Sequence, residues 1–129
     1  MTELIIEQRE DTPFVNFNPE KNIFVIKNKS LPENAIAFYE PILIWIDSYI
    51  NEPLEETYFN MSFEYFNTAS AKQIGKLLVR IQKLSKVSKT QINWHYEPDD
   101  IGMLHAGKRF AKLTGLNFNY VESKIEYGE

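Results

Sequence analysis

Short apolar stretches with strand-like patterns occur near the amino terminus of the chain. They read LIIE (4–7), FVNF (14–17) and IFVIK (23–27). Between the second and third stretches lies Asn18-Pro19, a pair of residues that commonly begins a turn. We therefore expect the strands at 14–17 and 23–27 to form an antiparallel hairpin.

The following segment has the pattern of a largely apolar helix. Ser30 and Glu33 have the spacing of a capping box, in which each side chain accepts a hydrogen bond from a free backbone N–H at the helix start. We predict that this helix covers residues 31–50, where apolar side chains occupy most of its circumference. A helix of this kind is either deeply buried or shared with a partner.

From residue 57 onward, strand-type alternation and helix-type periodicity follow each other in turn. The predicted elements are a strand at 57–66, a helix at 69–86, a strand at 90–96, a helix that follows EPDD (97–100) and ends before Gly115, and a strand at 116–121. Strands joined in this way pair in parallel through right-handed crossovers.

The three later strands each have one aromatic face and one mostly polar face. In the first of them, the expected aromatic face comprises Phe59, Met61, Phe63 and Tyr65. Strands that are covered by helices on both faces are almost continuously apolar, so we expect the helices mainly on one side of the sheet. The pattern predicts a single α/β domain over residues 1–129, with a mixed sheet that has an antiparallel hairpin and then parallel strands.

Composition and charge narrow the class of function. The chain has 129 residues, of which 43% are hydrophobic, as in a globular protein with one substantial core. Its net charge of −4 argues against nucleic acid or an anionic membrane as the main partner. The longest apolar stretch, around PILIWI (41–46), is far shorter than the ~20 residues of a membrane-spanning helix, and no signal peptide is recognisable. We therefore expect the protein in the cytoplasm.

Residues suited to catalysis or metal binding are few. The chain has no cysteine, which removes thiolate catalysis and zinc–thiolate sites. His95 and His105 match no ligand spacing, and Asp99 and Asp100 are typical of a helix start. A cationic stripe at helical spacing, typical of a solvated face, comprises Lys72, Lys76, Arg80 and Lys83. We expect no catalytic residue, no metal and no cofactor.

The segment EYFNTASAK (64–72) joins a predicted strand to a predicted helix and is rich in capping residues. Asn67, Thr68 and Ser70 are all good N-caps, and Ser70 has a glutamine three residues later, as in a capping box. A helix start also carries partial positive charge and free N–H groups, so it can bind an anion. Lys72 lies one turn after Thr68 and can reach an anion there. The segment is therefore either an ordinary cap or also the place where the protein is regulated.

Four blocks of the sequence resemble the SiaC family of bacterial regulatory phosphoproteins. They are PENAIAFYEPILIWIDSYI (32–50), FEYFNTASAK (63–72), INWHYEPDD (92–100) and MLHAGKRFAKLTGLNFNYVE (103–122). The resemblance covers nearly the whole chain and implies a fold like that of anti-sigma-factor antagonists, the STAS-like fold. It also implies that Thr68 is phosphorylated by a partner kinase and dephosphorylated by a metal-dependent serine/threonine phosphatase. In the family, the unphosphorylated protein binds and activates a diguanylate cyclase, which raises cyclic-di-GMP and promotes aggregation or biofilm formation.

The leading hypothesis is a non-catalytic regulatory phosphoprotein that is phosphorylated at Thr68. Its phosphosite environment and part of the partner-binding surface comprise Asn67, Ser70 and Lys72. Two alternatives stay open. The protein is a module that binds a small anion or a nucleotide at the helix start, residues 67–70, or it is an enzyme that uses Glu64, His95 and Asp99.

Overall fold

The computed structural model of this chain describes residues 2–124. The strands in this part are β1 (Leu4–Ile6), β2 (Phe14–Asn18), β3 (Ile23–Ser30), β4 (Glu56–Phe66), β5 (Lys89–Tyr96) and β6 (Phe118–Glu122). The helices are α1 (Ala35–Tyr49), α2 (Thr68–Leu84) and α3 (Ile101–Thr114).

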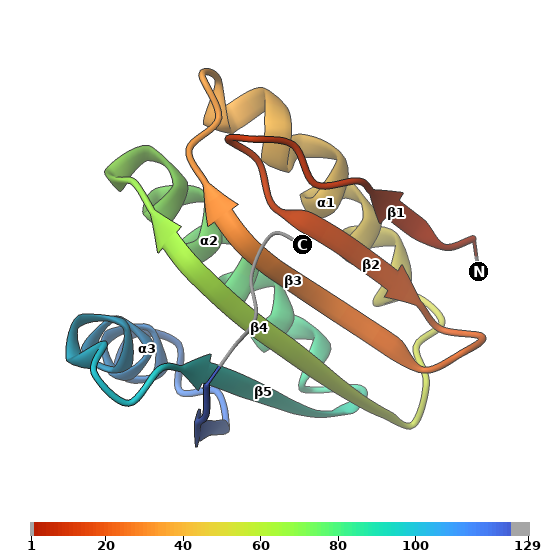
Figure 1. The fold of residues 1–129 in the computed structure, drawn as a ribbon. Coiled ribbons are helices and arrows are strands. Elements are labelled where there is room, and N and C mark those ends of the chain that lie inside the picture. The colour runs from red at the N-terminus through yellow and green to blue at the C-terminus, as the bar shows by residue number, and fades with distance from the viewer. Residues whose placement is uncertain (1, 125–129) are drawn as a thin grey trace.

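All the strands belong to one sheet, in which they lie side by side in the order of the sequence. The pairs β1–β2 and β2–β3 are antiparallel, whereas β3–β4, β4–β5 and β5–β6 are parallel. The helices lie on one side of this sheet, and no helix of residues 2–124 covers the other side, which is called the open side (Figure 1). The predicted mixed sheet, with its hairpin followed by parallel strands and its helices on one side, is confirmed.

The core lies between the covered side of the sheet and the helices. Strand side chains that are fully buried there are Val15, Phe17, Phe24, Ile26, Phe59, Met61, Phe63, Ile92 and Trp94. The helices contribute Tyr39, Ile42, Ile46 and Tyr49 from α1, and Ile74, Leu77, Leu78 and Ile81 from α2. The apolar side chains that alternate along the strands and those that repeat along the helices therefore pack into a single core, as the sequence predicts.

Helix α1 begins later than predicted, because Ser30 belongs to β3 and not to a helix cap. The N-cap is Asn34, whose Oδ1 accepts a hydrogen bond from Ala37 N at 3.1 Å. The Ser30 side chain points into the core instead. The capping box assigned to Ser30 and Glu33 is therefore wrong.

Between residues 2 and 124, no helix combines the length and the continuous apolar character that crossing a bilayer requires.

The predicted position of Tyr65 on the aromatic face of β4 is also wrong, because its side chain is 53% exposed. The pairing of β3 with β4 shifts by one residue near the end of the two strands. Asn28 pairs with Phe63 but the next residue, Lys29, pairs with Tyr65, which leaves Glu64 as the additional residue of a β-bulge. An inserted residue reverses the alternation that follows it. The bulge therefore turns Tyr65 toward solvent just before α2 begins.

Helix α3 approaches β5 closely at Gly107. A Cβ atom at this position would lie 2.6 Å from the indole ring of Trp94. The Trp94 Nε1–H also donates a hydrogen bond to Met103 O of α3 at 2.9 Å. The absence of a side chain at residue 107 thus permits the packing of α3 against the sheet, with the helix held in place by the indole.

Replacing Gly107 by Ala is expected to lower the free energy of unfolding by about 1–3 kcal/mol, because an overpacked core forces Trp94 or α3 to move. Chemical unfolding followed by Trp fluorescence measures this loss. Gly75→Ala in α2 is the matched control, since its Cβ would meet Phe110 at an ordinary 3.7 Å. The control should gain up to ~1 kcal/mol from helix propensity. Equal effects of the two substitutions would contradict the close approach at Gly107.

Candidate functional site

The start of α2 is fixed by Asn67, which directly follows β4. The Asn67 N–H donates a hydrogen bond to Ser30 O at the end of β3, at 3.2 Å. Its Oδ1 accepts a hydrogen bond from Ser70 N at 2.8 Å, so Asn67 is the N-cap of the helix. This cap satisfies one of the N–H groups that a helix start leaves free. The helix consequently begins at Thr68, one residue earlier than predicted.

Ser70 has a different role from the one predicted for it. Its side chain is completely buried, and its Oγ–H donates a hydrogen bond to Ser30 O at 3.0 Å. The Ser30 hydroxyl in turn donates to Ser70 Oγ at 2.8 Å. Ser70 is therefore an internal link between α2 and β3, so its predicted capping box is wrong, and its hydroxyl faces the interior and not the surface where a partner was expected.

Tyr39 of α1 completes this buried network, with its hydroxyl oxygen 2.6 Å from Ser30 Oγ. Because the one Ser30 hydroxyl proton is directed to Ser70, the Tyr39 hydroxyl is the donor in this contact. Burial of Tyr39 raises the pKa of its hydroxyl to about 12, an effect that the hydrogen bonds with Ser30 and Ser70 partly offset. The network joins α1, β3 and α2 below the helix start.

Thr68 lies on the outside of this network. It occupies the first position of α2 and is exposed. Within residues 2–124 its hydroxyl has no hydrogen-bond partner, in contrast to the hydroxyl of Ser70. Lys72 is also exposed, lies one turn further along α2 and forms no ion pair in this part of the chain. The four residues of the predicted site thus separate into a cap, a buried link, and a surface hydroxyl with a cation one turn away.

Two residues of the enzyme alternative, Glu64 and His95, interact with other groups. Glu64 Oε2 lies 3.8 Å from Lys29 Nζ, and His95 Nε2 lies 3.0 Å from Asn60 Oδ1. Partial burial lowers the pKa of His95. Asp99 is exposed in the turn before α3. No interaction among the described residues joins Glu64, His95 and Asp99, and no group of three possible metal ligands occurs in residues 2–124.

Sequence reasoning missed a row of amide side chains on the open side of the sheet. Asn93 Oδ1 accepts hydrogen bonds from Gln91 Nε2 at 2.7 Å and from Asn119 Nδ2 at 3.2 Å, and Gln91 Oε1 accepts from Asn117 at 3.3 Å. The strand pattern predicts polar residues on this side, but their mutual pairing depends on the register between strands. The amides therefore satisfy part of one another's hydrogen-bonding capacity.

Fold and site together define a single α/β domain, with its helices on one side of a mixed sheet, that carries a surface hydroxyl at a helix start. Comparison with known proteins assigns this domain to a family. The family model described as "SiaC family regulatory phosphoprotein" matches residues 6–123. The chain therefore belongs to the SiaC family, as the four sequence blocks indicate.

Individual relatives are distant in sequence but similar in structure. An uncharacterized protein of Pseudomonas aeruginosa (strain UCBPP-PA14) is 19% identical over 119 residues, which are 92% of this chain and 94% of the relative. The structure of SiaC of Pseudomonas aeruginosa matches with a TM-score of 0.84 at 17% identity, over 95% of this chain and 100% of that chain. A crystal structure of the diguanylate cyclase SiaD with its activator SiaC, also from Pseudomonas aeruginosa, matches with a TM-score of 0.85 at 16% identity, over 93% and 99% of the two chains. The likeness to these structures establishes the fold.

The different roles of the Ser70 and Thr68 hydroxyls can be tested by substituting each residue with Ala. Ser70→Ala leaves the buried Ser30 hydroxyl proton without its acceptor and removes one of the two hydrogen bonds to the Ser30 carbonyl, so the free energy of unfolding should fall by about 1–3 kcal/mol. Thr68→Ala removes a solvent-exposed hydroxyl and should change it by no more than ~0.5 kcal/mol. Urea unfolding measures both. Equal losses would mean that Thr68 also supports the fold.

The buried Tyr39 hydroxyl predicts a loss of stability at high pH. Its pKa is about 12 in the folded protein and about 10 when unfolded, so the neutral form is favoured by folding. The contribution of this pKa difference to the free energy of unfolding is complete below pH 10. It decreases by up to about 3 kcal/mol as the pH rises toward 12. Unfolding free energies of the parent and Tyr39→Phe should therefore approach each other between pH 10 and 12. A constant difference over this range would contradict the raised pKa.

Proposed function

We propose that this chain is a non-catalytic regulatory phosphoprotein whose phosphorylation site is Thr68. A kinase adds the phosphate, a metal-dependent serine/threonine phosphatase removes it, and the unphosphorylated form binds and activates a diguanylate cyclase in the cytoplasm. The observation that carries the proposal is the contrast at the start of α2. Thr68 is exposed and has no hydrogen-bond partner in residues 2–124, whereas the Ser70 hydroxyl is buried. A modifying enzyme can reach only the first of them.

The position of Thr68 gives phosphorylation a large local effect without a need to unfold the domain. A phosphoryl group adds about −1.5 to −2 charges at pH 7. The N-terminal end of α2 stabilises these charges through its partial positive charge, and Lys72 one turn away adds a full positive charge. Because the hydroxyl carries no contact of the fold, its modification removes none. The change is therefore confined to the surface, where a bulky dianion repels an acidic or apolar partner.

The choice of a diguanylate cyclase as the partner is supported by family membership and by the SiaC–SiaD complex, in which the SiaC chain is named as the activator of that cyclase. We propose neither nucleic acid nor a membrane as a partner, since the chain has a net charge of −4. An anion-binding module is the weaker candidate, because the Ser70 N–H already donates a hydrogen bond to Asn67 Oδ1 and is not available to an anion. An enzyme is weaker still, because Glu64 and His95 are paired with Lys29 and Asn60.

Phosphosite mapping of protein purified from its own host should place the phosphate on Thr68, and none on Ser70. Thr68→Ala should bind the host's cyclase as the unphosphorylated parent does and should no longer be inhibited by the kinase. Thr68→Glu should weaken binding, although by less than phosphorylation, because Glu has one negative charge and not two. Titration calorimetry and a cyclase assay measure these effects.

Gln82→Glu, on the exposed side of α2, is the control for the negative charge that Thr68→Glu adds. Phosphate at a residue other than Thr68 would overturn the assignment. The same holds if phosphorylated and unphosphorylated parent bind the cyclase with equal affinity.

A further inference from the structure

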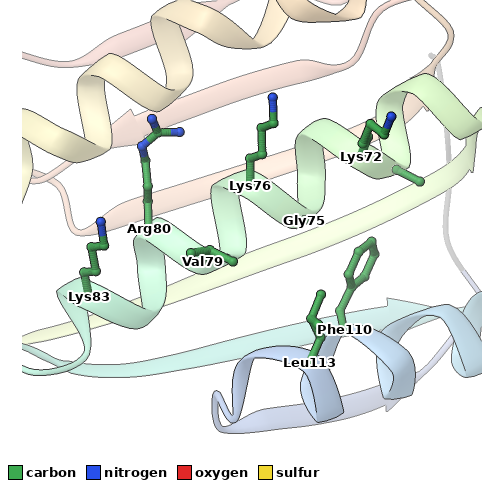
Figure 2. A pocket seen from close by; sticks show the side chains of 9 residues that line it. Lys72, Gly75, Lys76, Val79, Arg80, Lys83, Phe110 and Leu113 are labelled. Carbon is green, nitrogen blue, oxygen red and sulfur yellow. The ribbon is translucent and has the colours of Figure 1, made fainter.

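A groove runs between α2 and α3 on the outside of the molecule, and its lower part is apolar (Figure 2). Phe110 and Leu113 of α3 point toward α2 at Gly75 and Val79. Two of these apolar side chains are unusually open to solvent, since Val79 is 41% exposed and Leu113 is 71% exposed. An apolar surface that joins two helices and remains open is a feature of binding sites.

The α2 side of the groove is positively charged. The side chains of Lys72, Lys76, Arg80 and Lys83 extend from this helix (Figure 2). Arg80 is engaged in the fold, because its Nε lies 2.9 Å from Asp47 Oδ1 of α1. The three lysines form no ion pair in residues 2–124. A stripe of unpaired cations beside an open apolar groove is therefore a local exception in a chain with net charge −4.

The groove also adjoins the proposed phosphorylation site. Thr68, Lys72, Lys76 and Lys83 recur at intervals of four or seven residues, so they lie along one side of α2. Between Lys72 and Lys83 the helix rises about 16 Å, which is close to three turns of a second helix laid beside it. Lys72 is thus shared: it lines the groove and lies one turn from Thr68.

We propose that this groove is the docking surface for an amphipathic helix of the protein partner. Apolar side chains of that helix pack on Val79, Phe110 and Leu113, and its Asp or Glu side chains pair with Lys72, Lys76 and Lys83. This inference rests on the proposed function and gives the partner's chemistry. A phosphate on Thr68 attracts Lys72 away from the partner and repels the nearest acidic side chain of the docked helix. The binding energy comes from the apolar centre, and the lysines set orientation and rate.

The apolar part of the proposal is tested with two matched substitutions, Val79→Asp and Val87→Asp. Both valines are exposed, at 41% and 58%, but Val87 follows the end of α2 and does not line the groove. The probe is a diguanylate cyclase of the same organism that binds the unphosphorylated parent. Val79→Asp, and likewise Leu113→Asp, should raise the dissociation constant by about tenfold or more, and Val87→Asp by less than about threefold. Circular dichroism melting establishes that the variants are folded.

The charged part is tested with Lys76→Glu and its control Lys86→Glu, an exposed lysine outside the groove. Only Lys76→Glu should slow association, and the parent's association rate should fall as salt is added. Hydrogen exchange of the complex should be slowed in 71–83 and around 110–113.

The outcomes separate the two proposals. If the parent binds the cyclase and Val79→Asp and Leu113→Asp bind it equally well, the groove is wrong while the phosphorylation switch stands. If the parent binds no diguanylate cyclase of its organism, the proposed function fails, and the groove proposal that rests on it fails too. Binding of duplex DNA or of phosphatidylglycerol vesicles that is lost in Lys76→Glu would assign the lysines to a polyanion and overturn the helical partner.

Discussion

The contact between the end of β3 and the start of α2 determines where every residue of the proposed site lies. The Ser30 carbonyl accepts hydrogen bonds from Asn67 N–H and from the Ser70 hydroxyl, and the Ser30 hydroxyl is paired with Tyr39 and Ser70. One residue at the end of a strand thus holds two helices. Buried polar groups are costly unless they are paired, so this arrangement favours a single geometry of the junction. Thr68 lies at the surface between Asn67, which caps the helix, and Ser70, which is buried against β3.

The geometry of this junction is also consistent with the proposed switch at Thr68, which requires no change of fold. Asn67 supplies the cap and Ser70 supplies the buried link, so neither function is left to Thr68. Under our proposal, modification of Thr68 acts on the outer surface of α2 and removes none of the hydrogen bonds around Ser30.

The local patterns in the sequence predicted the fold well, because alternation and helical periodicity report which side of each element is buried. They failed where a residue is placed by a distant part of the chain. Ser30 has the sequence of a helix cap, but its partners are Tyr39 and Ser70, the latter forty residues away. Tyr65 fits the alternation of β4, and only the pairing with β3 reveals the bulge that turns it outward. The roles of Thr68 and Ser70 were indistinguishable for the same reason, since both residue types are good caps.

The distance dependence of charge interactions limits what a phosphate on Thr68 can do along the groove. From Thr68 to Lys83 the axis of α2 rises about 22 Å, whereas charges at physiological salt are screened over about 8 Å. If Thr68 carries the phosphate, as we propose, its charge acts strongly at Lys72, weakly at Lys76 and hardly at all at Lys83. Under the two proposals, a partner whose acidic side chains gather near Lys72 is displaced by phosphorylation, and one that relies on the far end of the groove is not.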